Sequence, residues 1–206
     1  YNGVLVGYQG NGGAVTIPEA VTSIADGVFM GRTDITSVDL NDVTTIGAYA
    51  FANCTALTSV TGGSVITIGA YAFVATALTS FTGDSVQTVG DYAFAYCYAL
   101  ASASFGTSLT AIGEGAFTIV EGGTAVAFSL TIAATGAPTL GADAFANRTG
   151  LTVYVPSAAV DAYKAAEGWS AYVDSISAIA GTETADGTDS GSVADPEPDD
   201  STAAAV

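Results

Sequence analysis

The 206-residue chain contains no histidine and very few basic residues. Histidine is the commonest general base and metal ligand, so its absence argues against the usual catalytic triads and zinc sites. Three Lys and Arg residues stand against twenty Asp and Glu residues, which gives a net charge of −17. Nucleic acids and anionic membrane surfaces both attract clustered Lys and Arg. We therefore expect no binding to nucleic acid or to anionic lipid.

Long apolar runs and charged side chains are also scarce. No stretch of about 18 apolar residues is present, so no membrane span is predicted. Charged residues make up 11% of the chain, against roughly 25% in average soluble domains. The surface is therefore expected to consist mainly of small neutral residues. Because the chain begins with Tyr1 rather than Met, we expect it to be a processed or excised piece of a longer protein.

A motif of about 22 residues repeats along the chain and can be aligned on a phenylalanine. Apolar residues recur five and eight positions before this residue, and usually six and nine positions after it. One such coil cannot bury its own apolar side chains, whereas stacked coils about 4.8 Å apart align them into continuous ladders. The six phenylalanines are Phe29, Phe51, Phe73, Phe94, Phe117 and Phe145.

These repeats predict a β-rich solenoid of about six coils. The LTSV-type and VTTI-type segments are expected to form short strands, and the AYAFANC-type segment a single helical or 3₁₀ turn. The glycine that follows most Ile positions is expected to allow a tight corner. Residues 157–169 predict a C-terminal helix capped by Ser157. The solenoid is predicted to span residues 1–178, with an N-terminal β cap and a C-terminal helical cap.

The segment TIGAYAFANCTALTSV resembles the BspA-type (treponemal-type) leucine-rich repeat family, whose pattern is roughly I-G-x-x-A-F-x-x-C-x-x-L-x-x-V. The opening NGVLVGYQGNGGAVTIPEAVTSIADGVF and the ending VYVPSAAVDAYKAAEGWSAY resemble the entry segment and closing cap of that family. The resemblance implies right-handed leucine-rich-repeat coils, a secreted or surface-anchored bacterial protein, and a role in adhesion or binding.

The cysteine slot of the repeat is filled only by Cys54 and Cys97, which lie two coils apart. Two coils span about 10 Å, whereas a disulfide needs Cα atoms within about 7 Å. We therefore predict two free, buried thiols that pack as small apolar groups. Arg32 and Arg148 occupy the same slot in other coils and are expected at the coil surface.

Two rows of side chains are candidates for binding. Tyr49, Tyr71 and Tyr92 each lie two residues before a repeat phenylalanine and are expected to stack. This row is either an aromatic platform for a sugar or protein partner, or a packing ladder on the convex side. Thr58 and Thr79 belong to a threonine row, which occurs on ice-binding solenoids but is also what an exposed face of any stacked β-coil tolerates.

Residues 179–206 are rich in Gly, Ser, Thr, Pro and acidic residues and are predicted to form a tail or linker. The tail is either a spacer or a contact between copies of the chain. Its carboxylates could hold calcium, which binds oxygen-only sites, although their spacing is not that of an EF-hand. No other cofactor and no metal site is expected.

Together these features predict a non-catalytic, extracellular or cell-surface recognition and adhesion domain that presents a repeat surface to a protein or glycan partner. The alternative is a structural subunit of an extracellular self-assembly, such as a filament or surface layer, held as a homo-oligomer partly by the acidic tail. An enzyme is not expected, because the chain offers few ionisable groups besides carboxylates.

Overall fold

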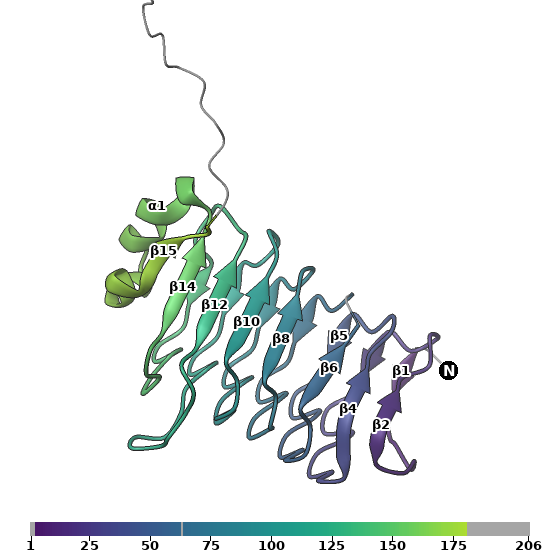
Figure 1. Ribbon diagram of the computed structural model, residues 1–206. Helices are drawn as coiled ribbons and strands as arrows, with labels where there is room; N and C mark the ends of the chain where they lie inside the picture. Colours follow the sequence, from purple (N-terminus) through teal and green to yellow (C-terminus); the bar gives the residue numbers. More distant parts are fainter. Residues whose placement is uncertain (1–2, 63, 181–206) are drawn as a thin grey trace, which may run out of the picture.

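A computed structural model describes residues 3–62 and 64–180 and shows a right-handed β-solenoid of stacked coils (Figure 1). Each coil contributes one strand to a back sheet and one to a front face. The predicted tail lies outside the described residues, apart from its first two. The back sheet has seven parallel strands in chain order. They are β1 (Val4–Leu5), β3 (Ser23–Ile24), β5 (Thr45–Ile46), β7 (Thr67–Ile68), β9 (Thr88–Val89), β11 (Ala111–Ile112) and β13 (Thr139–Leu140).

The front face consists of two parallel sheets rather than one. The N-terminal sheet has three strands, β2 (Gly13–Thr16), β4 (Ile35–Asp39) and β6 (Ser59–Thr61). The C-terminal sheet has five, β8 (Ser80–Gly83), β10 (Ser102–Phe105), β12 (Ser129–Ile132), β14 (Thr152–Val155) and β15 (Ile176–Ala178). The prediction of about six coils was too low, because the two end segments add coils of their own and bring the solenoid to about eight turns.

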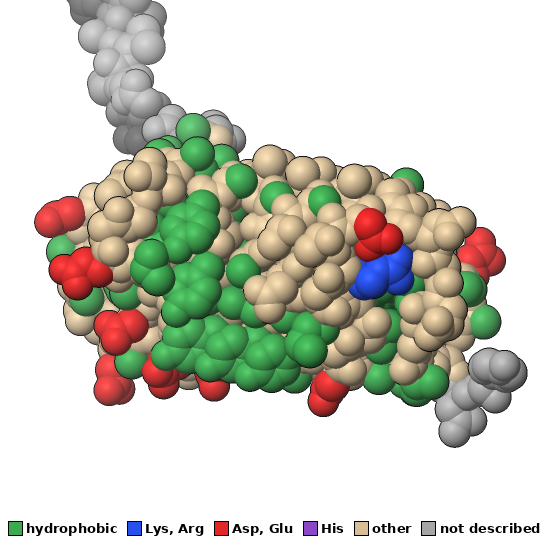
Figure 2. Space-filling model, turned by 90° about the horizontal axis from the view of Figure 1, so that it is seen from below, with side chains coloured by type: hydrophobic (Ala, Val, Ile, Leu, Met, Phe, Trp, Pro, Cys, Tyr) green, Lys and Arg blue, Asp and Glu red, His purple; other side chains and the backbone are tan. Residues whose placement is uncertain are grey.

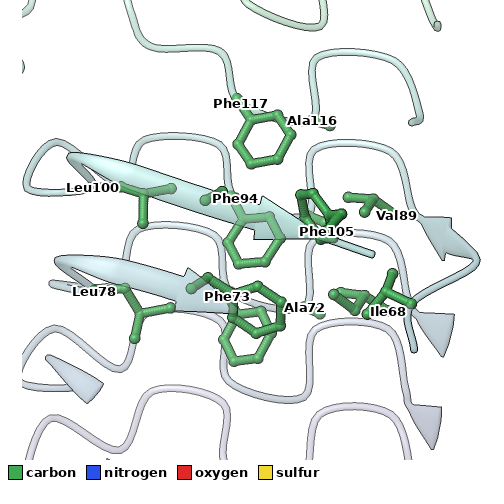
Figure 3. Packing of buried hydrophobic residues seen from close by; sticks show 14 of the residues in the cluster. Ile68, Ala72, Phe73, Leu78, Val89, Phe94, Leu100, Phe105, Ala116 and Phe117 are labelled. Atoms are coloured by element: carbon green, nitrogen blue, oxygen red, sulfur yellow. The ribbon is translucent and has the colours of Figure 1, made fainter. Parts of the chain in front are cut away.

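The repeat phenylalanines form a buried ladder between the two faces, as predicted (Figure 3). Consecutive rings are stacked, with centroids 4.9 Å apart for Phe29 and Phe51 and 5.7 Å apart for Phe117 and Phe145. The backbone repeats with them: the Phe51 N–H donates to Ala72 O in the next coil at 2.8 Å, and the same bond recurs along the ladder. Like side chains therefore pack on like because equivalent backbones are hydrogen-bonded in register.

The turn that carries each phenylalanine is not a helix. Around Phe51, successive i→i+3 bonds join Ala52 N to Tyr49 O and Cys54 N to Phe51 O, as in a 3₁₀ turn. Tyr49 and Asn53 both have a φ of 57°, in the left-handed region, which prevents the turns from merging into a helix.

The glycines after the Ile positions lie between a back strand and the following turn, as predicted, but glycine is required there for close packing between coils. Gly69 and Gly90 do not adopt positive φ. A Cβ built on Gly90 would lie 2.6 Å from Ala70 N and 2.7 Å from Gly69 C in the preceding coil. Only a residue without a side chain lets neighbouring coils approach this closely. The predicted conformational reason was therefore wrong, although the positions are those where glycine is required.

A short helical segment covers the C-terminal end of the solenoid. It comprises η1 (Ser157–Ala159), α1 (Val160–Ala165) and η2 (Trp169–Ser175), in place of the single helix predicted over residues 157–169. No side chain caps it, so the predicted Ser157 cap is wrong. Its buried anchors are Tyr163, whose hydroxyl donates to Ala134 O at 2.9 Å, and Trp169, whose Nε1 donates to Pro138 O at 2.7 Å.

Candidate binding surface

The three predicted tyrosines occupy a backbone position that disfavours most side chains. Tyr49, Tyr71 and Tyr92 have φ values of 57°, 58° and 54°. The equivalent positions in other coils are Gly27 and Gly115, which adopt this region without cost, and Asp143, whose φ is 54°. A left-handed conformation costs a non-glycine residue about 1–2 kcal/mol. The tyrosine side chains must therefore be retained against a backbone preference for glycine.

The tyrosine rings stack along the solenoid axis. The centroids of Tyr49 and Tyr71 are 4.8 Å apart and those of Tyr71 and Tyr92 are 5.1 Å apart, with the ring planes within 2° and 10° of parallel. The Tyr92 ring in turn lies against Gly115, where a Cβ would come within 2.4 Å of it. Stacked rings cover one another's faces, so the column presents mainly ring edges and hydroxyl groups outward. A sugar stacks on a ring face, and this arrangement leaves little ring face for it.

Two carboxylates adjoin the tyrosine column. The Tyr92 hydroxyl donates to Glu114 Oε1 at 2.7 Å, and this hydrogen bond, with partial burial, raises the pKa of Tyr92 to about 12. Burial also raises the pKa of Tyr71, with smaller contributions from Tyr49 and from the charges of Asp91 and Glu114. Asp91 Oδ1 accepts a bond from Glu114 N at 2.8 Å, which orders the carboxylate of Asp91.

Two further tyrosines, which were not among the predicted binding residues, lie in the same coil as Tyr92. Tyr96 and Tyr98 line a hollow of about 370 Å³ whose other walls are Thr and Ala side chains. Tyr96 lies one turn after Tyr92, a turn closed by the hydrogen bond from Ala95 N to Tyr92 O at 3.1 Å, so the hollow belongs to the same turn as the end of the column. The signal was present in the sequence: FAYCYAL carries tyrosine at the two positions that hold Asn53 and Thr55 in FANCTAL.

We call these five residues, Tyr49, Tyr71, Tyr92, Tyr96 and Tyr98, together with the hollow, the tyrosine surface. Seen from below, the molecule shows a continuous hydrophobic area with acidic side chains along its lower border (Figure 2). The single basic side chain in that view lies away from the area. The remaining walls of the hollow are Thr55, Ala75, Thr76, Ala77 and Ala99.

The predicted threonines lie elsewhere on the coil. Thr58 immediately precedes the front strand β6 and Thr79 immediately precedes β8, and both are exposed. The Thr58 hydroxyl donates to Thr36 O at 3.2 Å, and Thr79 N donates to Thr58 O at 3.3 Å. The tyrosines stand at the start of the turn that joins the back and front strands, whereas the threonines stand at its end. The structure thus gives two separate candidate surfaces.

A groove of about 390 Å³ follows the line where the two front sheets meet, which we call the seam. Across it, β6 and β8 form no ladder among the residues described. Gly62 occupies the slot that holds the buried Leu40 in the preceding coil, and the next coil has Gly83 there, so no large apolar side chain anchors the core at this slot on either side of the seam. The groove is lined by Ser59, Val60, Thr61, Gly62, Ser80 and Thr82.

Both cysteines are free and buried, as predicted. Burial raises the pKa of the Cys54 thiol to about 11 and also raises that of Cys97. The Cys54 thiol donates to Phe29 O at 3.0 Å, and the Cys97 thiol to Phe73 O at 3.1 Å. Thiols held protonated in this way are poor nucleophiles and poor metal ligands, so their part is packing.

The two arginines of the cysteine slot differ from one another. Arg32 is partly exposed and pairs with Asp34 at 2.8 Å, as expected for a surface residue. Arg148 is buried, which contradicts the prediction. Its guanidinium donates to three backbone carbonyls, Phe117 O at 2.8 Å, Cys97 O at 3.1 Å and Leu100 O at 3.3 Å. It also lies 4.8 Å from the centre of the Phe128 ring.

Within residues 3–62 and 64–180, no cluster of three or more Cys, Asp or Glu side chains could hold a metal ion. The same part of the chain includes no helix that is long and apolar enough to cross a membrane. The acidic tail, where calcium was considered, lies outside the described residues.

Comparison with known proteins agrees with this architecture. The family model for the BspA type leucine rich repeat region matches residues 8–122 in six copies. A leucine rich cell surface protein from Faecalibacterium prausnitzii A2-165 is 29% identical, with a TM-score of 0.50, over 74% of this chain and 50% of that chain. The pneumococcal vaccine antigen PcpA is 18% identical, with a TM-score of 0.63, over 86% and 43%, and this likeness shows the fold alone.

The chain spans half or less of the length of these two solved structures. No curated protein sequence matches it.

Proposed function

The chain belongs to the BspA-type leucine-rich repeat family, and from this premise we propose that it is a non-catalytic adhesion or recognition module that acts outside the cell or on its surface. The family is one of repeat proteins suited to binding, and the similar protein from Faecalibacterium prausnitzii is described as a cell surface protein. Solenoids generally bind through extended surfaces built from successive repeats.

The tyrosine surface is the observation that carries the proposal. Exposed, contiguous aromatic side chains on an otherwise small and neutral surface are typical of interaction sites. Tyrosine is enriched at interface hot spots because it combines a large apolar body with a hydrogen-bonding hydroxyl. Here five tyrosines from coils that are adjacent in space form one such surface, of which Tyr49 is 43% exposed.

The geometry favours a protein partner over a glycan. The rings of the column cover one another's faces, whereas their edges, their hydroxyls and the alanine-walled hollow beside Tyr96 and Tyr98 remain accessible. Apolar and amide groups of a polypeptide can fill such a hollow and bond to the hydroxyls. Thr58 and Thr79, at the edge of the seam, are proposed as a secondary contact.

An array of extracellular-matrix proteins and glycans tests this proposal. The informative variant is Tyr96→Asn with Tyr98→Thr, because it gives this coil the residues found in the FANCTAL coil, two coils earlier, and should fold normally. Tyr154→Thr, on β14, is the matched control for loss of a tyrosine elsewhere. We expect a protein ligand whose binding falls at least about tenfold in the double variant and not in the control.

Three outcomes would contradict the proposal. Equal binding by the double variant would exclude the tyrosine surface as the contact. Ligands found only among the glycans would change the partner class. Self-association of the purified chain in sedimentation, with no ligand on the array, would favour the structural-subunit alternative.

A further inference from the structure

The tyrosine surface carries an unbalanced negative charge. Asp91 and Glu114 are exposed, and Glu114 accepts a hydrogen bond from Tyr92, whose ring stacks on that of Tyr71 at 5.1 Å. Glu114 is held in place by the Tyr92 hydroxyl and Asp91 by the Glu114 backbone. Both carboxylates are therefore ordered without being neutralised.

No cation of the described chain is available to balance these carboxylates. Arg32 pairs with Asp34, and Arg148 is buried against backbone carbonyls. Lys164 belongs to α1 in the C-terminal cap. The one ion pair among the described residues is the Arg32–Asp34 pair, so the charge beside the tyrosines faces solvent unpaired.

The groups at this surface are mainly hydrogen-bond acceptors. With its proton committed to Glu114, the Tyr92 hydroxyl offers only its oxygen, and the carboxylates accept only. Lysine and arginine supply the matching donors, and arginine can engage a carboxylate with two parallel bonds. Their long apolar stems can lie along tyrosine edges and in the alanine-walled hollow while the charged ends reach the carboxylates. A metal ion is a poorer match, since the described residues offer no three-carboxylate cluster.

We propose that the tyrosine surface binds a basic segment of a partner protein, one that presents lysine or arginine to Asp91 and Glu114 and apolar groups to the hollow. This inference rests on the proposed binding function and specifies the chemistry of its partner. Charge complementarity of this kind speeds association and excludes acidic competitors.

The test uses the full chain and two 12-residue probe peptides, one alternating arginine with alanine and one alternating glutamate with alanine. Fluorescence anisotropy at about 150 mM salt measures both affinities, because screening at this salt suppresses diffuse attraction to a chain of net charge −17. The site variant is Asp91→Asn with Glu114→Gln, which keeps the hydrogen bonds to Glu114 N and Tyr92. The control is Asp161→Asn with Glu167→Gln, which removes the same charge from the exposed surface of the C-terminal cap.

We expect the arginine peptide to bind and the glutamate peptide not to bind. The site variant should raise the Kd of the arginine peptide about five- to tenfold, the effect of losing two exposed charge contacts, and the control less than twofold. An equal loss in both variants would show diffuse electrostatic attraction and overturn the proposal, as would no binding of the arginine peptide.

The array ligand separates this inference from the proposed function. If Tyr96→Asn with Tyr98→Thr abolishes binding of that ligand while Asp91→Asn with Glu114→Gln leaves it intact, the binding surface stands and the basic partner is excluded. If both double variants leave it intact, the surface itself is excluded.

Discussion

At the scale of single residues, Arg148 departs most from what its position in the repeat predicts, because its side chain is buried. It replaces a small cysteine-slot residue, yet it reaches two coils back to Leu100 and Cys97 as well as to Phe117. Burial lowers the pKa of the guanidinium. Its desolvation is offset by three carbonyl acceptors and by the face of Phe128, and no carboxylate is involved.

Replacing Arg148 with alanine should therefore destabilise the protein by about 2–4 kcal/mol, because three carbonyls lose a donor and a cavity remains. Arg32→Ala is the matched control: Arg32 pairs with Asp34, donates to Gly10 O and lies over the Tyr8 ring, but these contacts are exposed, so the loss of stability should be smaller. Urea denaturation followed by circular dichroism measures both. If the free energy of unfolding falls as little for Arg148→Ala as for Arg32→Ala, the three carbonyls must accept hydrogen bonds from water in the variant.

At the scale of structural elements, the contact between coils depends on glycines whose role is steric. Gly90→Ala should destabilise by about 1–3 kcal/mol, since the new methyl group would press on the backbone at Gly69 and Ala70. Gly136→Ala is the control: its Cβ would meet nothing within 4 Å, so stability should stay unchanged or rise slightly. Thermal unfolding compares the two, and equal melting temperatures would mean that the coils separate without cost.

The sequence predicted the ladders well and the exceptions poorly. The Phe, Ile and Leu positions are fixed by spacing alone, so the stacked core around Phe73 followed directly from the repeat. The burial of Arg148 could not be predicted, because it depends on space beside Phe128, in a coil whose length departs from the repeat. The seam likewise depends on the space that Gly62 leaves in the core, and this space is recognised only when the neighbouring coils are placed beside it.

The candidate site was predicted in part for a similar reason. Tyr49 and its equivalents stood out because they recur at one position of the repeat. Tyr96 and Tyr98 occur in one coil only, four and six residues after Tyr92, so no row along the axis marks them, and the hollow that they line is visible only in the fold. Periodicity in the sequence identifies rows of side chains along the axis, whereas a surface that runs across a coil can be identified only from the three-dimensional structure.

At the scale of the whole molecule, we propose that the solenoid is complete without the acidic tail. The cap already closes the C-terminal end through Tyr163 and Trp169, both fully buried. Deletion of residues 181–206 should therefore leave the free energy of unfolding unchanged. Both the intact and the truncated chain should sediment as monomers, as expected if the tail is a spacer. Assembly that disappears on truncation would contradict this, and its sensitivity to a chelator would identify calcium as the agent holding the copies together.

The seam also has a mechanical consequence. The backbone hydrogen bonds between coils run along the solenoid axis. A force applied to the two ends therefore breaks the bonds between one pair of coils before it loads those of the next pair. The front ladder is interrupted between β6 and β8, and the coils there are held by the back sheet, the hydrogen bonds between the phenylalanine turns and the core. Tension should first open the molecule at this point. Each coil of about 22 residues then releases roughly 70 Å of chain, so the molecule should lengthen in steps when it is pulled at both ends.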